Sequence, residues 1–277
     1  MGRYSAGGSG FGSDFGSGFA PTNGPGGQPQ DLSSTFRNLC RSSPWKWTSL
    51  RFEYLERPGT GANLVRAWLR RPGALRLETP DGKLLHSTTG INDSRDDLYV
   101  SATRRSWLLP AHLVTPVYDG AGLVRRRPEA AYGEPSFGNG RLAAALDPVE
   151  LAGNAPVPLE FPDSNRVSLE EPREVDHEGR SALETVVTRG RTYVPLDPSQ
   201  PLAHPGRTLI RVDAATGVCV ASQSLDGDTS GKGHWLKILA VDEYMLDEYM
   251  LDDLFLAESM NLTDVRRHIS WDIGPAA

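Results

Sequence analysis

Histidines are the side chains most able to do chemistry in this sequence, and their spacing argues against a preformed active site. They form no H-x-H, H-x-x-x-H or H-E-x-x-H motif, the spacings that let imidazoles close in sequence share a metal ion. No G-x-S-x-G sequence is present to expose a serine nucleophile. We therefore expect no enzymatic activity, no metal site and no cofactor. The six histidines are His86, His112, His177, His204, His234 and His268.

Three short motifs resemble ligand loops but are better explained as turns. Residues 226–231 read D-G-D-T-S-G, the opening of a calcium loop, yet the twelfth position is Lys237, where a bidentate glutamate is needed. Residues 59–61 (G-T-G) lack the third glycine of a phosphate-binding fingerprint. Residues 138–140 (G-N-G) precede a short helix, where an anion could bind. We predict turns or hairpin loops at all three places.

Arginines form short runs at residues 70–71, 104–105, 125–127 and 266–267. The chain as a whole carries a net charge of -6 and an isoelectric point of about 5.6. No global field therefore favours nucleic acid. The runs are interpreted as solvated surface, with a phosphate-binding patch as the alternative.

The two cysteines, Cys40 and Cys219, cannot form a disulfide framework, and no C-x-x-C pair indicates zinc or redox chemistry. Cys219 lies in an apolar strand pattern, where a small buried side chain is expected. Whether the two cysteines bond to each other is left open. No stretch approaches the ~20 apolar residues that span a bilayer. Because residues 1–30 also lack the apolar core of a secretory signal, we expect a cytoplasmic location.

The chain begins with a Gly/Ser-rich tail, residues 1–30, that we predict to be disordered. It contains ten glycines and almost no aliphatic side chains, so little buried surface could offset the entropy of ordering it. Phe11, Phe15 and Phe19 recur there every four residues and could act as docking contacts, against the simpler interpretation of a solubilising linker. Residues 242–251 read DEYML twice, which indicates an acidic surface loop or, alternatively, a binding peptide.

Residues 31–273 are predicted to form a single, mainly β domain. One short helix at residues 31–43, capped by Ser33 or Ser34, precedes segments in which apolar and polar residues alternate. Short Pro-Gly and Asp-Gly turns separate these segments, and such loops join antiparallel neighbours. Two antiparallel meanders result, one before and one after a proline-rich middle. The expected strands are residues 47–55, 64–70, 74–79, 83–88, 97–102, 167–171, 181–189, 208–213, 218–225 and 234–241.

The proline-rich middle is the least regular part. Residues 107–118 are apolar but contain two prolines, which demote them to an edge strand or loop. Residues 141–146 favour a short helix. Asp147, Pro148 and Glu150 have the spacing of a second helix start, with aspartate as the cap and glutamate three residues on.

Four segments carry a resemblance to a known family. They are residues 209–225 (LIRVDAATGVCVASQSL), 67–82 (AWLRRPGALRLETPDG), 147–151 (DPVEL) and 252–255 (DDLF). Together they resemble the lipoprotein-carrier superfamily that includes LolA and the N-terminal domain of RseB, over about residues 45–256. The resemblance implies a strongly curved antiparallel sheet that forms a half-open barrel, with a few short helices capping its concave, apolar face.

Six apolar side chains on the first two strands would face inward in such a fold. They line either a packed core or a ligand cavity, since both need the same alternation of apolar residues. The six are Leu50, Phe52, Tyr54, Val65, Ala67 and Leu69.

Two functions follow as hypotheses. The first is a non-enzymatic binding module that accommodates a lipid acyl chain or another apolar ligand on the concave face of the sheet. The alternative, implied by the RseB-like members, is a protein-interaction or regulatory domain that binds a partner protein. Neither hypothesis involves nucleic acid or a segment that spans a membrane.

Overall fold

The computed structural model describes residues 31–58, 63–71, 74–88, 111–129, 139–158 and 160–243. The predictions for the tail and its three phenylalanines, for the strand at residues 97–102 and for the DEYML repeat beyond Glu243 lie outside these residues. One antiparallel sheet of ten strands dominates the described part of the chain. The predicted mainly β fold class is therefore confirmed.

Both predicted meanders are present and belong to the same sheet. The first consists of β1 (Ser49–Arg57), β2 (Val65–Arg70), β3 (Ala74–Glu78) and β4 (Leu84–Thr88). The second consists of β7 (Val167–Leu169), β8 (Arg173–His177), β9 (Arg180–Arg189), β10 (Arg207–Asp213), β11 (Cys219–Ser224) and β12 (Gly233–Val241). The strand order is β4-β3-β2-β1-β12-β11-β10-β9-β7, with β8 also paired to β9.

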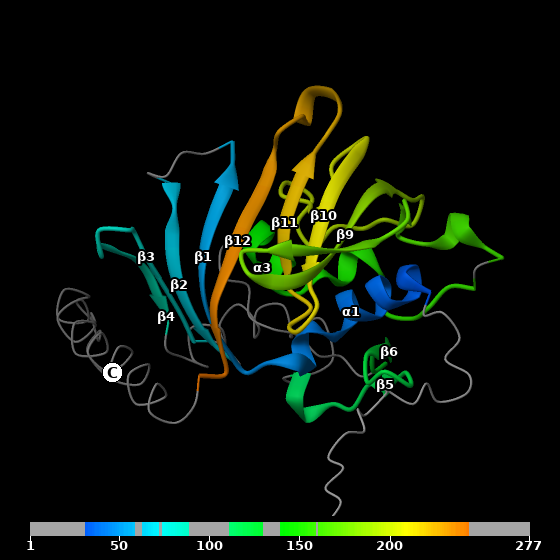
Figure 1. Ribbon diagram of the computed structural model, residues 1–277, viewed down its shortest axis with the longest axis horizontal. Helices are drawn as coiled ribbons and strands as arrows, with labels where there is room; N and C mark the ends of the chain where they lie inside the picture. The colour runs from blue at the N-terminus through cyan, green and yellow to red at the C-terminus, as the bar shows by residue number, and fades with distance from the viewer. Residues whose placement is uncertain are drawn as a thin grey trace, which may run out of the picture. The chain divides into compact units, whose positions relative to one another are not determined.

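The last strand, β12, joins the two meanders by pairing with the first, β1. Their register runs from Leu50 opposite Val241 to Arg57 opposite Gly233. Leu239 is an extra residue in this ladder and is 42% exposed. A bulge of this kind bends a strand and increases its twist. The sheet is coiled in Figure 1, and among the described residues β4 forms one of its edges while β7 and β8 form the other, as a half-open fold requires.

Shorter elements complete the structure. The α-helices are α1 (Leu32–Lys46) and α3 (Gly140–Leu146), and the 3-10 turns are η2 (Ala111–Leu113), η3 (Pro148–Leu151), η4 (Pro162–Ser164) and η5 (Gly227–Thr229). β5 (Val117–Tyr118) and β6 (Val124–Arg126) form a separate two-stranded hairpin. The calcium-like motif forms η5 in the turn between β11 and β12, so the prediction of a turn there is confirmed.

The start and end of α1 differ from the prediction. Asp31, rather than a serine, is the cap, because its carboxylate accepts a hydrogen bond from the backbone N–H of Ser33 at 3.0 Å. The helix also continues past residue 43 to Lys46. Its last turn is held in place by the Ser43 hydroxyl, which donates to the carbonyl of Leu146 at 2.6 Å.

Two turns show why glycine is needed where the chain reverses. Between β8 and β9, Glu178 and Gly179 have φ values of 56° and 81°, the pair of positive angles of a type I′ hairpin. Between β10 and β11, Gly217 has φ 73°, and a Cβ there would lie 2.7 Å from the carbonyl oxygen of Leu39 in α1. The β10–β11 turn therefore lies directly against α1.

The core consists of two apolar clusters on the side of the sheet that the helices cover. The first gathers α1 and α3 against β7, β9 and β10, and includes Phe36, Leu39, Ala144, Val187 and Ile210. The second gathers α3 and Trp47 against β1, β2, β3, β11 and β12, and includes Phe52, Leu69, Leu146, Val220 and Leu236. In Figure 1, α3 lies at the middle of the sheet, against β11, and α1 lies near the β9–β10 end, against β10.

Candidate binding cleft

The six inner-face side chains predicted from the sequence lie side by side on β1 and β2. The cross-strand pairs are Leu50 with Leu69, Phe52 with Ala67, and Tyr54 with Val65. All except Val65, which is partly buried, are exposed by 3% or less. Leu142 and Leu146 of α3, together with Trp47, belong to the same cluster. Side chains therefore fill this part of the concave face, which favours the packed-core alternative, and a ligand-binding role for the six residues stays a prediction.

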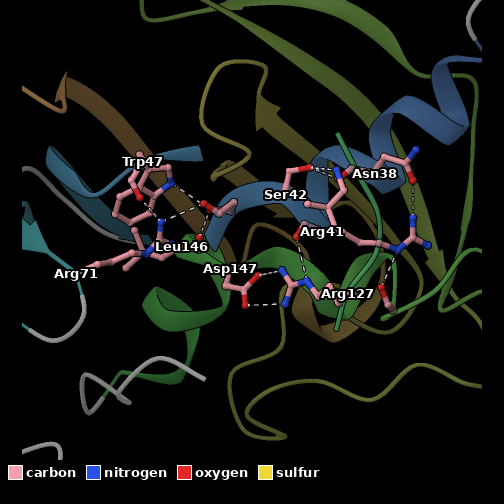
Figure 2. Close-up of polar contacts among 11 residues, drawn as sticks. Asn38, Arg41, Ser42, Trp47, Arg71, Arg127, Leu146 and Asp147 are labelled. Atoms are coloured by element: carbon pink, nitrogen blue, oxygen red, sulfur yellow. Dashed lines mark hydrogen bonds and ion pairs between the residues drawn. The ribbon is translucent and has the colours of Figure 1, made fainter. Parts of the chain in front are cut away.

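A buried guanidinium organises the helical side of the molecule. Arg41 of α1 is 1% exposed. Its Nε donates to the carbonyl of Gly153 at 2.8 Å, and its Nη2 donates to the carbonyls of Ala152 and Ala155 at 3.0 and 3.1 Å. Its Nη1 donates to the side-chain oxygen of Asn38 at 2.7 Å (Figure 2). Burial lowers the pKa of Arg41 to about 10, so the side chain remains a cation at neutral pH.

A second buried guanidinium fixes the end of the β5–β6 hairpin. Arg127 is 4% exposed, donates from Nε to the carbonyl of Arg41 at 3.0 Å, and forms a two-pronged ion pair with Asp147 (Figure 2). The backbone N–H of Val124 donates to the hydroxyl of Ser42 at 2.7 Å. The interpretation of the whole arginine run as solvated surface is therefore wrong for Arg127, because a carboxylate and a helix carbonyl bind its guanidinium in the interior.

An open cleft with a volume of about 400 Å³ lies beside this network. Its lining among the described residues is Val117, Arg125, Arg126, Ala155 and Pro156. Both walls are attached to buried arginines. The wall of Ala155 is held by its carbonyl bond to Arg41, and the backbone N–H of Arg127, next to the cleft arginines, donates to the carbonyl of Asn154 at 2.8 Å. We call this feature the arginine cleft.

The two arginines of the cleft are exposed, and within the described part of the chain neither Arg125 nor Arg126 forms an ion pair. The carboxylate of the same hairpin, Asp119, is occupied elsewhere. Its oxygens accept hydrogen bonds from the Asn38 side chain at 2.7 Å and from two backbone N–H groups of its own turn at 2.9 Å. Among the described residues, two arginines therefore stand at this cleft without forming a salt bridge.

Sequence reasoning missed the arginine cleft because its walls come from two segments that share no motif. The arginine run at residues 125–127 was the one usable signal. Which of its members turn inward depends on the distant Asp147, and the sequence does not show that pairing.

A serine–histidine pair resembles a catalytic dyad but is enclosed by the core. The hydroxyl of Ser222 donates to Nδ1 of His234 at 2.8 Å, and Nε2 of the same ring donates to the carbonyl of Cys219 at 2.8 Å. Both side chains are 1% exposed, and the ring stacks on Tyr54 with centroids 5.8 Å apart. Burial lowers the pKa of His234 to about 3. The pair therefore holds β11 to β12 with a neutral imidazole.

The free energy of unfolding should decrease as pH falls below about 6.5, because two histidines are buried in the folded protein. Burial lowers the pKa of His234 to about 3 and, with the charge of Arg141, lowers that of His204 to about 4. Both folded-state pKa values lie below the unfolded value, so the stability is present above pH ~6.5 and is lost as pH falls toward 3–4. At pH 5 the loss relative to pH 7 should be about 2 kcal/mol for His234 and smaller for His204, whose shift is partly screened by solvent. Urea unfolding at the two pH values measures this loss.

Variants separate this effect from other titrating groups. His234→Asn should remove its share of the difference between pH 7 and pH 5, whereas the exposed His86→Gln should keep the full difference. His204→Asn provides a second test if His234→Asn does not fold. An equal pH difference in all of these proteins would contradict the assignment. Glu150, whose pKa is raised by burial, acts in the opposite direction and is common to all of them.

The other reactive groups among the described residues are either buried or not clustered into a site. No cluster of three His, Cys, Asp or Glu side chains suited to a metal ion occurs among them. Cys40 and Cys219 are unbonded and buried, as predicted for Cys219. Burial raises the pKa of Cys40 to about 12 and that of Cys219 well above its usual value, so neither thiol is activated. In this part of the chain, no helix has the length and apolar character needed to cross a membrane.

Comparison with known proteins finds similarity only at the level of solved structures. No protein-family model matches the sequence, and no curated protein matches it. Among solved structures, the crystal structure of MucB is similar over 76% of this chain and 60% of that chain, with 15% sequence identity and a TM-score of 0.28. This chain thus spans less than two thirds of the length of MucB in that structure.

Proposed function

We propose that this chain is a non-enzymatic binding module and that its partner is a segment of another protein, held in the arginine cleft. The observation that carries the proposal is the cleft itself, with a volume of about 400 Å³. Binding pockets commonly measure roughly 300–1,000 Å³. Three apolar residues and two arginines without intramolecular ion pairs in the described part line it.

The walls of the cleft support the proposal because they are already held in place. Arg41 and Arg127, both almost fully buried, bind the segment on one side and the hairpin on the other. A site that needs no ordering keeps more of its contact energy as affinity. Exposed apolar side chains continue on the same hairpin and just before it: Val117 is 46%, Tyr118 48% and Leu113 62% exposed.

The non-enzymatic part of the proposal rests on two sets of buried polar side chains that bind only groups of this chain. His234 and Ser222 bond to each other inside the core. The carboxylate of Glu150 accepts three hydrogen bonds from its own chain and is 4% exposed. Neither set is accessible to a substrate.

Panning a phage-displayed library of random 12-residue peptides on the full chain tests the proposal. We expect peptides to be enriched on the wild-type protein and to lose at least about tenfold in binding on Ala155→Trp. Ala155 is exposed, so tryptophan there fills the cleft while the backbone carbonyl that binds Arg41 remains. Ser230→Trp is the matched control, since that exposed residue lies in the turn between β11 and β12, far from the β5–β6 hairpin in Figure 1.

The outcomes are separable. Enriched peptides that bind wild type and Ser230→Trp but not Ala155→Trp support the arginine cleft as the site. No enrichment on the wild-type chain would overturn the proposal. Equal binding to all three proteins would place the site elsewhere and would also overturn it. Melting temperatures of the two variants show whether each is folded.

The apolar-ligand hypothesis has one observation in its favour. Two leucines of the seven-residue helix α3 share a cluster with the inner-face side chains, and a helix of this size could move aside. The ligand would have to displace Leu142, Leu146 and Trp47. Native mass spectrometry and lipid extraction of the purified chain decide the matter. A bound acyl chain would favour this function, and ligand-free protein would favour the arginine cleft.

A further inference from the structure

We propose that the arginine cleft selects peptide segments in which carboxylate side chains flank an aliphatic one. This inference rests on the proposed function and names the chemistry of its partner. The cleft combines two arginines with three apolar lining residues, so its natural complement carries the opposite charge beside an apolar side chain.

The charge part of the complement follows from the two arginines. Arg126 lies on β6 directly across from Val117 of β5, and Arg125 is its neighbour in the strand. A guanidinium binds a carboxylate with two parallel hydrogen bonds, so each arginine can fix one acidic side chain in position. Asp119 and Asp147, acids of the hairpin and of the network beneath it, already bind Asn38 and Arg127.

The apolar part follows from the rest of the lining. Val117, Ala155 and Pro156 contribute hydrocarbon surface to the same cleft as the arginines. An aliphatic side chain that enters the cleft removes this surface from water. Each Å² of apolar area buried in this way favours binding by roughly 25 cal/mol. Pro156 is rigid, and Arg41 holds the neighbouring backbone at Ala155. This wall therefore loses little conformational entropy when a segment binds.

A nucleic acid fits these observations less well. Its phosphate backbone would use the two arginines but not the three apolar residues. Proteins that bind nucleic acid usually spread many cations along one face, whereas this chain carries a net charge of -6. The same net charge disfavours a strongly acidic macromolecule, unless a short segment carries its acids directly opposite Arg125 and Arg126.

The sequences of the enriched peptides give the first test. Peptides that lose binding on Ala155→Trp should contain an excess of Asp and Glu beside Leu, Ile, Val or Met. Fluorescence anisotropy then measures the most enriched peptide against the double variant Arg125→Glu/Arg126→Glu. We expect its affinity to fall roughly 10- to 100-fold and to decrease with added salt on the wild-type chain.

The control double variant, Arg191→Glu/Arg207→Glu, makes the same change in net charge at two exposed positions, one in the loop after β9 and one at the start of β10. It should change the affinity by less than about threefold. Cleft-dependent peptides without an excess of acid, or equal binding to both double variants, would overturn the inference while the proposed function stands. Tighter, Arg125- and Arg126-dependent binding of a 12-nucleotide oligothymidylate would overturn it in favour of a phosphate site. Absence of any cleft-dependent peptide would overturn both.

Discussion

Replacing Arg41 with methionine is expected to lower the free energy of unfolding by about 3–5 kcal/mol. Three backbone carbonyls and the side chain of Asn38 lose their donor in this variant, and the Arg41 side chain that they surround is 1% exposed. Each buried acceptor left unsatisfied costs about 1–3 kcal/mol, and the relief of no longer burying a charge offsets part of the sum. Because whole domains are stable by only ~5–15 kcal/mol, urea unfolding should show the change clearly.

Two further variants test whether the loss depends on the several hydrogen bonds that the Arg41 guanidinium makes at once. Arg41→Lys should recover only part of the loss, because an ammonium group cannot span four acceptors as a guanidinium does. Arg37→Met, one turn earlier in α1, removes a single bond to the carbonyl of Val167 and should cost about 1 kcal/mol. Equal losses at Arg41 and Arg37 would contradict the structural role assigned to the buried network. Arg41→Met should also weaken cleft-dependent peptides, since the carbonyl of Ala155 is released.

Replacing Glu150 with alanine should have an effect of similar size, about 3–5 kcal/mol. Oε1 accepts hydrogen bonds from the Tyr193 hydroxyl at 2.6 Å and from the backbone N–H of Leu202 at 2.8 Å, and Oε2 accepts one from the N–H of Leu196 at 2.7 Å. Burial raises the pKa of this carboxyl group even though all three bonds oppose the shift. The variant leaves three donors unpaired and frees the segment that carries them.

Further variants show whether the lost stability comes from the hydrogen bonds of Glu150 or from any substitution in this region. Glu150→Gln keeps one accepting oxygen and should lose about half as much as Glu150→Ala. Glu170→Gln is the matched control, because that side chain is 59% exposed and pairs only with the exposed Arg207; its loss should stay within about 0.5 kcal/mol. If Glu150→Gln and Glu150→Ala lose the same amount, the hydrogen bonds of the carboxylate are not the cause.

The strands of this fold were predictable because their signals are local. Alternation in residues 47–55 and 64–70 indicated which side chains share a face, and β1 and β2 place Leu50, Phe52 and Tyr54 on one face as expected. Short glycine-containing turns indicated antiparallel neighbours, which the register of β1 to β4 and of β10 to β12 confirms. Period-two alternation alone could not decide between a packed core and a cavity, because the covering side chains of α3 come from a segment far away in the chain.

Polar side chains were harder to predict because their partners are distant. Asp147 and Glu150 had the spacing of a capping box, yet η3 has no side-chain cap bond at its start. The carboxylate of Asp147 binds Arg127 instead, and that of Glu150 binds the segment around Tyr193. Asp147 and Pro148 therefore occupy the predicted cap and first positions of η3, but their long-range partners take both carboxylates and no side-chain cap bond forms.

The measurement that tests the account most directly is a nuclear magnetic resonance titration of the ¹⁵N-labelled full chain with the most enriched peptide. The account predicts shifts of the backbone signals of Arg125 and Ala155, on the two walls of the arginine cleft, with Phe52 and Tyr54 of the packed inner face unchanged. Shifts at Phe52 and Tyr54 with the cleft signals unchanged would contradict it and would locate binding on the concave face of the sheet.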